Sequence, residues 1–369
     1  MSWNRIWKSA LGVAALSMAM GAQAASKGVT VTVVPEKSSH AQDEDVVVKV
    51  TITNTSDSPQ YMLKWRTPFE GIVAPLFDVT RDGAKVPYQG ALIKRPAPTA
   101  SDYFLLKPGA SHTVKVELSA LYDMSVTGDY VISYRTASPD ILLRGQGNRG
   151  ANPNAAVAGG GEEAAIVAEP ATVWIDGRLP RGATPQQTLD LEKMKTDVGT
   201  ASVSFASCTA SQQSTITSAM SAGLNMATSG SNYMNSGVIG TRYTKWFGAR
   251  NSTREAKVKT NFAAIKDAFA NKPVVVDCSC NQPYYAYVYP TQPYKVYVCK
   301  AFWSAPLTGT DSKGGTLLHE LSHFDVVAGT DDHVYGQSGA ASLAISDPNK
   351  AIANADSHEY FGENTPALN

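Results

Sequence analysis

The stretch LLHELSHFDVVAGTDDHVYG, from Leu317 to Gly336, decides which fold the second half of this chain can form. Its first part contains His319, Glu320 and His323 in the spacing H-E-x-x-H. Residues i and i+4 lie on one face of a helix, so both imidazoles can reach one metal ion while Glu320 stands beside it. Neutral imidazoles suit zinc, and a catalytic zinc keeps one position open for water. The motif therefore predicts a helix that carries a metal site, with Glu320 as general acid and base.

The same motif also arises by chance on solvated helix faces, so a third ligand is needed to support a metal site. We expect the helix to end at Gly329, a natural C-cap. The metzincin pattern fails because it requires a histidine at that position. Spacing alone does not choose among the remaining candidates, which are Glu359 and Glu363 from a later helix and Asp331, Asp332 and His333 just past the turn.

The N-terminal residues indicate export. Arg5 and Lys8 precede a short apolar run and an Ala22-Gln23-Ala24 cleavage site, so we interpret residues 1–24 as a signal peptide. The apolar run is too short to span a bilayer. Lys+Arg and Asp+Glu both number 32, so no net charge favours nucleic acid. We expect a secreted, extracellular protein with no stable membrane insertion and no nucleic-acid partner.

Four cysteines lie in the second half: Cys208, Cys278, Cys280 and Cys299. An even number in an exported chain predicts two disulfides, for which three pairings are possible. Cys278 and Cys280 flank one residue of an expected strand and are poorly placed to bond each other. We therefore favour Cys208–Cys278 with Cys280–Cys299. A cysteine zinc site is the rival interpretation, but a single C-x-C is a weak signal for it.

The chain divides into two parts whose sequence patterns predict different secondary structure. Residues 25–176 contain short segments with period-two alternation, such as DVVVKVTITN, which favour an all-β Ig-like sandwich. Residues 177–200 are interpreted as a linker. Residues 201–369 favour an α+β domain, mainly helical with a small sheet. There, Ser252 and Glu255 form an expected capping box, and YYAYVYP and YKVYVC predict a hairpin.

The sequence GTDDHVYG resembles the G-T-x-D-x-x-Y-G signature of the aspzincins, the deuterolysin-type metallopeptidases. The segments RYTKWFG, AYVYP and NADSHEYFGENTPA are similar to those of the peptidyl-Lys metalloendopeptidases, and the likeness runs from about Cys208 to the C-terminus. It implies a zincin-like catalytic domain with one catalytic Zn²⁺ held by His319, His323 and Asp332, and with Glu320 as general acid and base. Tyr335 is then expected to donate a hydrogen bond to the developing oxyanion.

The resemblance also implies that Asp356 receives the ammonium of a substrate lysine, with Glu359 adding negative potential. On a helical turn both side chains can face one pocket, and a narrow carboxylate pocket suits a compact ammonium better than a planar guanidinium. Substrates are expected to be proteins and peptides cut on the N-terminal side of lysine. The alternatives are an enzyme of broader, deuterolysin-like specificity and a non-catalytic secreted zinc-binding protein.

Residues 25–176 have the size and position of a propeptide. We expect this β-domain to cover the cleft, as an intramolecular inhibitor or a folding aid. Lys193 and Lys195 lie in the linker, so a lysine-specific enzyme could release itself by cutting before either of them.

Overall fold

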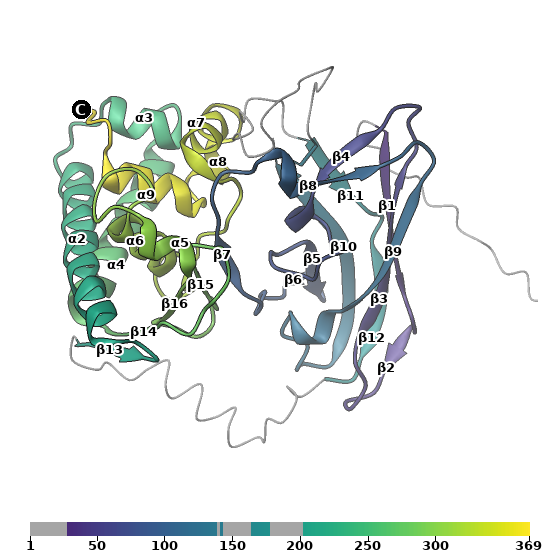
Figure 1. Cartoon of the computed structure of the whole chain (residues 1–369). Coiled ribbons are helices and arrows are strands. Elements are labelled where there is room, and N and C mark those ends of the chain that lie inside the picture. The colour runs from purple at the N-terminus through teal and green to yellow at the C-terminus, as the bar shows by residue number, and fades with distance from the viewer. Residues whose placement is uncertain (1–27, 139–140, 143–163, 178–201) are drawn as a thin grey trace, which may run out of the picture.

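The computed structural model describes residues 28–138, 141–142, 164–177 and 202–369. In this part of the chain, an N-terminal β-rich region and a C-terminal helical region each enclose a separate hydrophobic core (Figure 1). This confirms the expected division into more than one domain. The expected signal peptide, Lys193 and Lys195 lie outside the described residues, so these expectations stay predictions.

In its described residues, the N-terminal region consists of strands and three 3-10 turns. The bounds are β1 (Val29–Pro35), β2 (Ser39–His40), β3 (Val47–Asn54), β4 (Gln60–Leu63), η1 (Lys64–Arg66), β5 (Phe77–Arg81), β6 (Ala84–Lys85), β7 (Leu92–Lys94), η2 (Ala100–Asp102), β8 (Tyr103–Leu106), β9 (Ser111–Glu117), η3 (Leu118–Ala120), β10 (Gly128–Ser138), β11 (Ala164–Val167) and β12 (Ala171–Ile175). One sheet has the order β1-β3-β9, and a second has the order β2-β12-β10-β5-β6, with β11 paired to β10. Strands β4 and β8 form a separate two-stranded sheet.

Alternation along β3 shows why these segments are strands. Val48, Val50 and Ile52 are fully buried, whereas Lys49 between them is exposed. Because successive side chains of a strand point to opposite faces, this alternation buries one face of the sheet in the core. The β-rich character expected from the sequence is confirmed, and the Ig-like topology stays a prediction.

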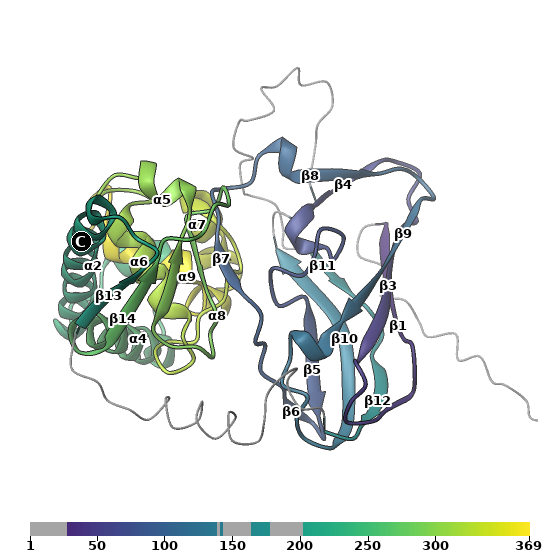
Figure 2. The same cartoon turned by 60° about the horizontal axis from the view of Figure 1, so that its bottom comes forward.

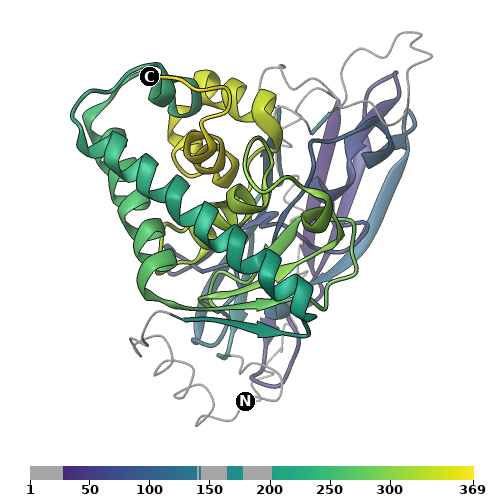
Figure 3. The ribbon, with the colours of Figure 1, turned by 60° about the vertical axis from the view of Figure 1, so that its left-hand side comes forward.

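The C-terminal region combines helices with a small sheet. The bounds are β13 (Ser202–Ala206), α2 (Ala210–Asn235), α3 (Thr241–Phe247), α4 (Ser252–Asn271), β14 (Pro273–Asp277), β15 (Ala286–Val288), β16 (Lys295–Val298), α5 (Lys300–Ser304), α6 (Lys313–His323), α7 (Gly336–Ser346), α8 (Pro348–Ala351) and α9 (Ala355–Glu363). The long α2 runs across the front of this region in Figure 3 and packs against α4 and α6. The antiparallel pair β15 and β16 confirms the expected hairpin.

The sheet of this region has the order β13-β14-β16-β15-β7. Its last strand comes from the N-terminal region, and Figure 2 shows β7 reaching the edge of the sheet beside the helices. In antiparallel register, Lys94 pairs with Ala286, and Ile93 pairs with Tyr287. The two regions therefore share one sheet.

Two disulfides join Cys208 to Cys278 and Cys280 to Cys299, which is the pairing favoured from the sequence. Cys208 and Cys278 each follow the end of one of the paired strands β13 and β14. Cys299 directly follows β16. The bonds therefore tie together the ends of neighbouring strands.

The expected capping box at Ser252 and Glu255 is wrong. The N-cap of α4 is Asn251, whose side-chain oxygen accepts hydrogen bonds from the backbone amides of Thr253 and Arg254. Asparagine is as good an N-cap as serine, and here it lies one residue earlier. Glu255 instead accepts a hydrogen bond of 2.8 Å from the side chain of Arg250.

The expectation that the motif helix extends to Gly329 is also wrong. Helix α6 ends at His323, because Phe324 adopts φ −58 and ψ 131, which breaks the helical hydrogen bonding. Gly329 lies in the following turn with φ +58, a left-handed conformation that favours glycine. The early end reverses the chain and brings Asp332 back beside the helix.

Within the described residues, no helix has both the length and the apolar character needed to cross a membrane.

Candidate functional site

His319 and His323, both on α6, point their Nε2 atoms towards the same carboxylate oxygen of Asp332. His319 Nε2 lies 3.1 Å from Asp332 Oδ1, and His323 Nε2 lies 3.5 Å from the same oxygen. The opposite nitrogens have close oxygen neighbours, since His323 Nδ1 lies 2.8 Å from the carbonyl oxygen of Thr330 and His319 Nδ1 lies 2.9 Å from Asp356 Oδ1. These contacts orient both rings and leave both Nε2 atoms for a shared ligand.

The donor atoms of His319, His323 and Asp332 fit a zinc ion. All lie within 4.8 Å of one another, and all three residues are buried. Among the described residues, neither Nε2 atom and neither Asp332 carboxylate oxygen has a well-directed hydrogen bond, which is unfavourable for buried polar atoms. Tetrahedral zinc with bonds of about 2.0–2.2 Å separates its ligand atoms by roughly 3.3 Å. Three protein ligands leave the fourth position open, as in catalytic zinc sites.

The other candidates for the third ligand lie elsewhere. Glu363 accepts hydrogen bonds from the backbone amide and hydroxyl of Ser312. The backbone of Asp331 forms an isolated bridge with Asn354. Glu359 groups with His319 and Asp356 on the other side of the imidazole. His333 is not a member of either group of possible metal ligands found in the described part of the chain.

Glu320 follows His319 on α6 and is fully buried. Neither of its carboxylate oxygens is hydrogen-bonded to any described residue. Burial raises the pKa of Glu320 well above its ordinary value, and the neighbouring His319 offsets this only in part. A buried carboxylate that interacts electrostatically with the proposed metal ligands His319 and Asp332 can serve as general acid and base.

The Tyr335 hydroxyl donates a hydrogen bond of 2.8 Å to the carbonyl oxygen of Ile93 in β7. The ring of Tyr335 packs edge-on against Trp65, with 6.3 Å between the ring centroids. Burial raises the pKa of Tyr335 well above its ordinary value, so the phenol keeps its proton and acts as a donor. A fixed donor facing a peptide carbonyl is the arrangement that can stabilise an oxyanion.

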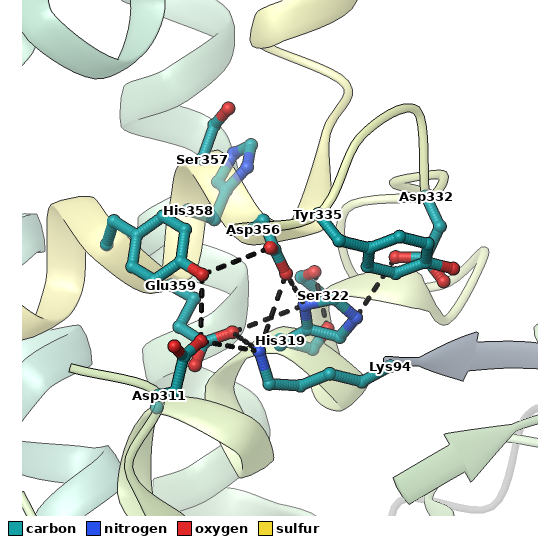
Figure 4. Close-up of polar contacts among 12 residues, drawn as sticks. Lys94, Asp311, His319, Ser322, Asp332, Tyr335, Asp356, Ser357, His358 and Glu359 are labelled. Carbon is teal, nitrogen blue, oxygen red and sulfur yellow. Dashed lines mark hydrogen bonds and ion pairs between the residues drawn. The ribbon is translucent and has the colours of Figure 1, made fainter. Parts of the chain in front are cut away.

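Asp356 and Glu359 are fully buried on α9, and with Asp311 their carboxylates form one acidic site, which we call the lysine pocket. Asp356 is held in place because its Oδ2 accepts hydrogen bonds from the backbone amide of Gly336 at 2.6 Å and from the Tyr360 hydroxyl at 3.2 Å. Gly315 of α6 allows the close approach of the two helices, since a Cβ there would lie 3.0 Å from Glu359 Oε1. The pocket directly adjoins His319, as Figure 4 shows.

The ammonium of Lys94 occupies this pocket. Lys94 Nζ lies 2.5 Å from Glu359 Oε2 and 3.5 Å from both Asp356 Oδ1 and Asp311 Oδ1 (Figure 4). The side chain of Lys94 is fully buried. Burial opposes its charge, but Asp356, Glu359 and Asp311 outweigh this and raise the pKa of Lys94 well above its ordinary value. The three carboxylates therefore stabilise the charged form of the Lys94 ammonium.

The backbone around Lys94 is also bound. The carbonyl oxygen of Lys94 accepts a hydrogen bond from the amide of Tyr285 at 3.1 Å. The preceding carbonyl, that of Ile93, faces Tyr335. The Ile93–Lys94 peptide bond thus lies between a hydrogen-bond donor for its carbonyl and an acidic pocket for its lysine side chain. This is β-strand addition to a sheet edge, a common mode of peptide recognition.

Arg66, in η1 of the N-terminal region, contacts the loop that carries Asp332. Its Nη2 donates hydrogen bonds of 2.6 Å to the carbonyl oxygens of Asp332 and His333. Together with the contact between Trp65 and Tyr335, this shows that η1 as well as β7 of the N-terminal region contacts the candidate site.

Sequence reasoning missed Lys94, Ile93, Arg66 and Asp311. Lys94 is one of many lysines and pairs with residues more than 200 positions away, so no local pattern marked it. The one available signal was its setting in ALIKRP, where a lysine follows three apolar residues.

Comparison with known proteins agrees with this geometry. A family model for aspzincins, described as "Lysine-specific metallo-endopeptidase", matches residues 233–363. An "Extracellular protease" of Aeromonas hydrophila is 48% identical over 328 residues, which cover 88% of this chain and 90% of that protein. A "Peptidyl-Lys metalloendopeptidase" of Armillaria mellea is 35% identical over 336 residues, or 88% of each chain. Another so named, from Pleurotus ostreatus, is 48% identical over 167 residues, which cover 44% of this chain and 98% of that protein.

Proposed function

Because this chain belongs to the aspzincin family and is a zinc metalloendopeptidase of the peptidyl-Lys type, we propose that it is secreted as a proenzyme and cuts proteins before lysine. The observation that carries the proposal is the buried ammonium of Lys94 beside Asp356 and Glu359, one peptide unit from the carbonyl that Tyr335 contacts.

His319, His323 and Asp332 are the proposed ligands of the single Zn²⁺. When bound, zinc polarises a carbonyl and makes water a stronger nucleophile at neutral pH. Glu320 accepts the proton of the attacking water and delivers it to the leaving amine, which its raised pKa favours. Tyr335 donates its hydroxyl proton in a hydrogen bond to the carbonyl oxygen as negative charge develops there.

Asp356 and Glu359 are proposed to select lysine as the residue that supplies the leaving amine. Both carboxylates are buried, so an uncharged side chain in the pocket leaves negative charge unpaired in a poorly solvated place. An ammonium is compact enough to contact both, as Lys94 does. The planar guanidinium of arginine needs a wider site.

The β-domain is proposed to act as a propeptide that covers the cleft. In the described structure, β7 occupies the sheet edge and fills the lysine pocket, and Arg66 contacts the metal-ligand loop. A peptidyl-Lys metalloendopeptidase matched over 98% of its length by 44% of this chain supports a shorter active form. Cleavage before Lys193 or Lys195 would separate the regions.

The test is digestion of a denatured protein mixture by the secreted protein, with every new N-terminus read by mass spectrometry. We expect nearly all new termini to begin with lysine, and a zinc chelator or Glu320→Gln to abolish them. Chelator-sensitive cuts at varied residues would instead support the broader, deuterolysin-like specificity. A zinc-loaded, processed sample that cuts nothing would support a zinc-binding protein without catalysis.

The same sample tests the proenzyme proposal. We expect the active band to begin at Lys193 or Lys195 and to lack the β-domain. Full activity in an uncleaved chain would contradict the proposed role of residues 25–176.

A further inference from the structure

The lysine pocket and the metal site share atoms. Asp356 Oδ1 lies 2.9 Å from His319 Nδ1 and 3.5 Å from Lys94 Nζ. Glu359 Oε2 lies 3.4 Å from the same His319 nitrogen and 2.5 Å from the same Lys94 ammonium. Each carboxylate therefore offers one and the same oxygen to the histidine and to the lysine, as the dashed lines of Figure 4 show.

This sharing takes place without solvent. His319, Lys94, Asp356 and Glu359 are all fully buried. At such sites a charge acts on its neighbours more strongly than it does in water. The other oxygen of Asp356 is bound by Gly336 and Tyr360, so the carboxylate cannot turn a second oxygen towards the histidine.

The electronic effect has a definite sign. A carboxylate that accepts the Nδ1–H of an imidazole increases the electron donation of the opposite Nε2, which strengthens its bond to a metal. An ammonium at the same carboxylate oxygen draws negative charge towards itself and reduces that donation. It also places a positive charge near the metal site, which opposes binding of another cation.

We propose that Asp356 and Glu359 couple the lysine pocket to the metal site, so that a lysine ammonium in the pocket weakens the hold of His319 on zinc. The inference rests on the proposed function of both sites. Asp356 and Glu359 are then positioning residues for His319 as well as the lysine pocket. A substrate lysine in the pocket would likewise reduce the electron donation of His319 to a bound zinc, so lysine specificity would act on kcat as well as on KM.

The full chain can be used for the test, because Lys94 already places an ammonium in the lysine pocket. Zinc affinity is measured at equilibrium by competition with a chromophoric chelator, in the Glu320→Gln background to prevent proteolysis. Equilibrium affinity is used because opening the cleft alters the rate of zinc exchange whatever the coupling. The test variant is Lys94→Met, and the matched control is Lys107→Met, which changes an exposed lysine of the same region.

We expect Lys94→Met to bind zinc about tenfold more tightly than the parent, within the range of ordinary coupling between sites. Lys107→Met should equal the parent. In Lys94→Gly, which leaves room for a ligand in the pocket, added n-butylamine, a probe with the ammonium and alkyl chain of lysine, should weaken zinc binding, and it should leave the parent unchanged. Equal zinc affinity in Lys94→Met and the parent overturns the proposal, and so does weaker zinc binding.

A second variant guards against a Lys94→Met protein that fails to fold. Glu359→Gln removes one shared carboxylate charge and keeps the Lys94 ammonium, so it should bind zinc more weakly than the parent, and equal affinity would overturn the proposal. Where Lys94→Met folds, it should have a smaller effect in the Glu359→Gln background than in the parent. Additive effects of the two changes overturn the coupling. Because zinc affinity is read in an inactive variant, the coupling can fail while digestion still yields lysine termini. Conversely, the zinc affinities can show the coupling while digestion yields no preference for lysine termini.

Discussion

The two faces of the His319 imidazole make an instructive comparison. On the Nε2 side, His323 and Asp332 present buried atoms without well-directed hydrogen bonds among the described residues. On the Nδ1 side, Asp356 and Glu359 are engaged by an ammonium that the protein itself supplies. Both sides can hold a cation, but one offers two nitrogens and a carboxylate, which suit zinc, whereas the other offers only oxygens, which suit an ammonium. In the proposed function, one histidine lies between the chemistry of the reaction and the recognition of its substrate.

The largest expected effect is the loss of kcat on substitution of Glu320, which adjoins the proposed metal ligand His319 in sequence. Glu320→Gln removes the proton acceptor while all three proposed ligands remain, so kcat should fall by about 10²–10⁴-fold with zinc content unchanged. Kinetics on a lysine peptide and metal analysis of the same sample measure both. Glu255→Gln, which changes a partly buried residue of α4 that pairs with Arg250, is the control and should leave kcat unchanged. Loss of zinc in Glu320→Gln would mean that this residue also belongs to the metal face.

The next effect concerns Tyr335, whose hydroxyl contacts the carbonyl oxygen of the residue before Lys94. Tyr335→Phe removes the donor to the carbonyl while the ring can still pack against Trp65, so kcat should fall by about 10²–10³-fold and KM by far less. Steady-state kinetics of the processed enzyme give both constants. A rise in KM with kcat unchanged would assign Tyr335 to binding alone.

The pocket face should set preference more than rate. Glu359→Gln keeps the shape of the pocket and removes one negative charge, so kcat/KM for lysine peptides should fall by about 10–100-fold relative to peptides with uncharged residues there. Competition between paired peptides, read by mass spectrometry, measures the ratio directly. Asp267→Asn, on α4, is the control and should not change it. An unchanged kcat/KM ratio in Glu359→Gln would contradict the proposal that the charge of Glu359 contributes to the preference for lysine.

The same comparison shows how far sequence carries the prediction. His319, Glu320 and His323 follow from spacing on one helix, because a local motif and its geometry coincide. Asp332 needed a family resemblance, since the chain turns back after Phe324 rather than after Gly329. Lys94 could not be predicted: its partners Asp356 and Glu359 lie on α9, and Asp311 lies before α6, so only the tertiary pairing of β7 with β15 brings Lys94 to them. Long-range contacts of this kind leave no periodic signal in the sequence.

The smallest effect concerns a histidine that belongs to neither face. His358 lies between Asp356 and Glu359 on α9, but its ring stacks on Phe262 at 5.6 Å between centroids, and its Nδ1 lies 2.9 Å from the carbonyl oxygen of Asn354. It has no carboxylate partner among the described residues, unlike His319. Burial lowers the pKa of His358 to about 4.

A lowered pKa in the folded state fixes the direction of the pH effect. The neutral ring is favoured by folding, so this contribution to stability is complete above the unfolded pKa of about 6.5 and is lost as the pH falls towards about 4. The loss approaches about 1.4 kcal/mol per pH unit in that window. Urea unfolding of zinc-free Glu320→Gln, with and without His358→Gln, measures it at pH 7.5 and pH 5. The gap in unfolding free energy between the two proteins should narrow at pH 5. A gap that is constant with pH would mean that His358 titrates normally, and that burial without a carboxylate is not what distinguishes it from His319.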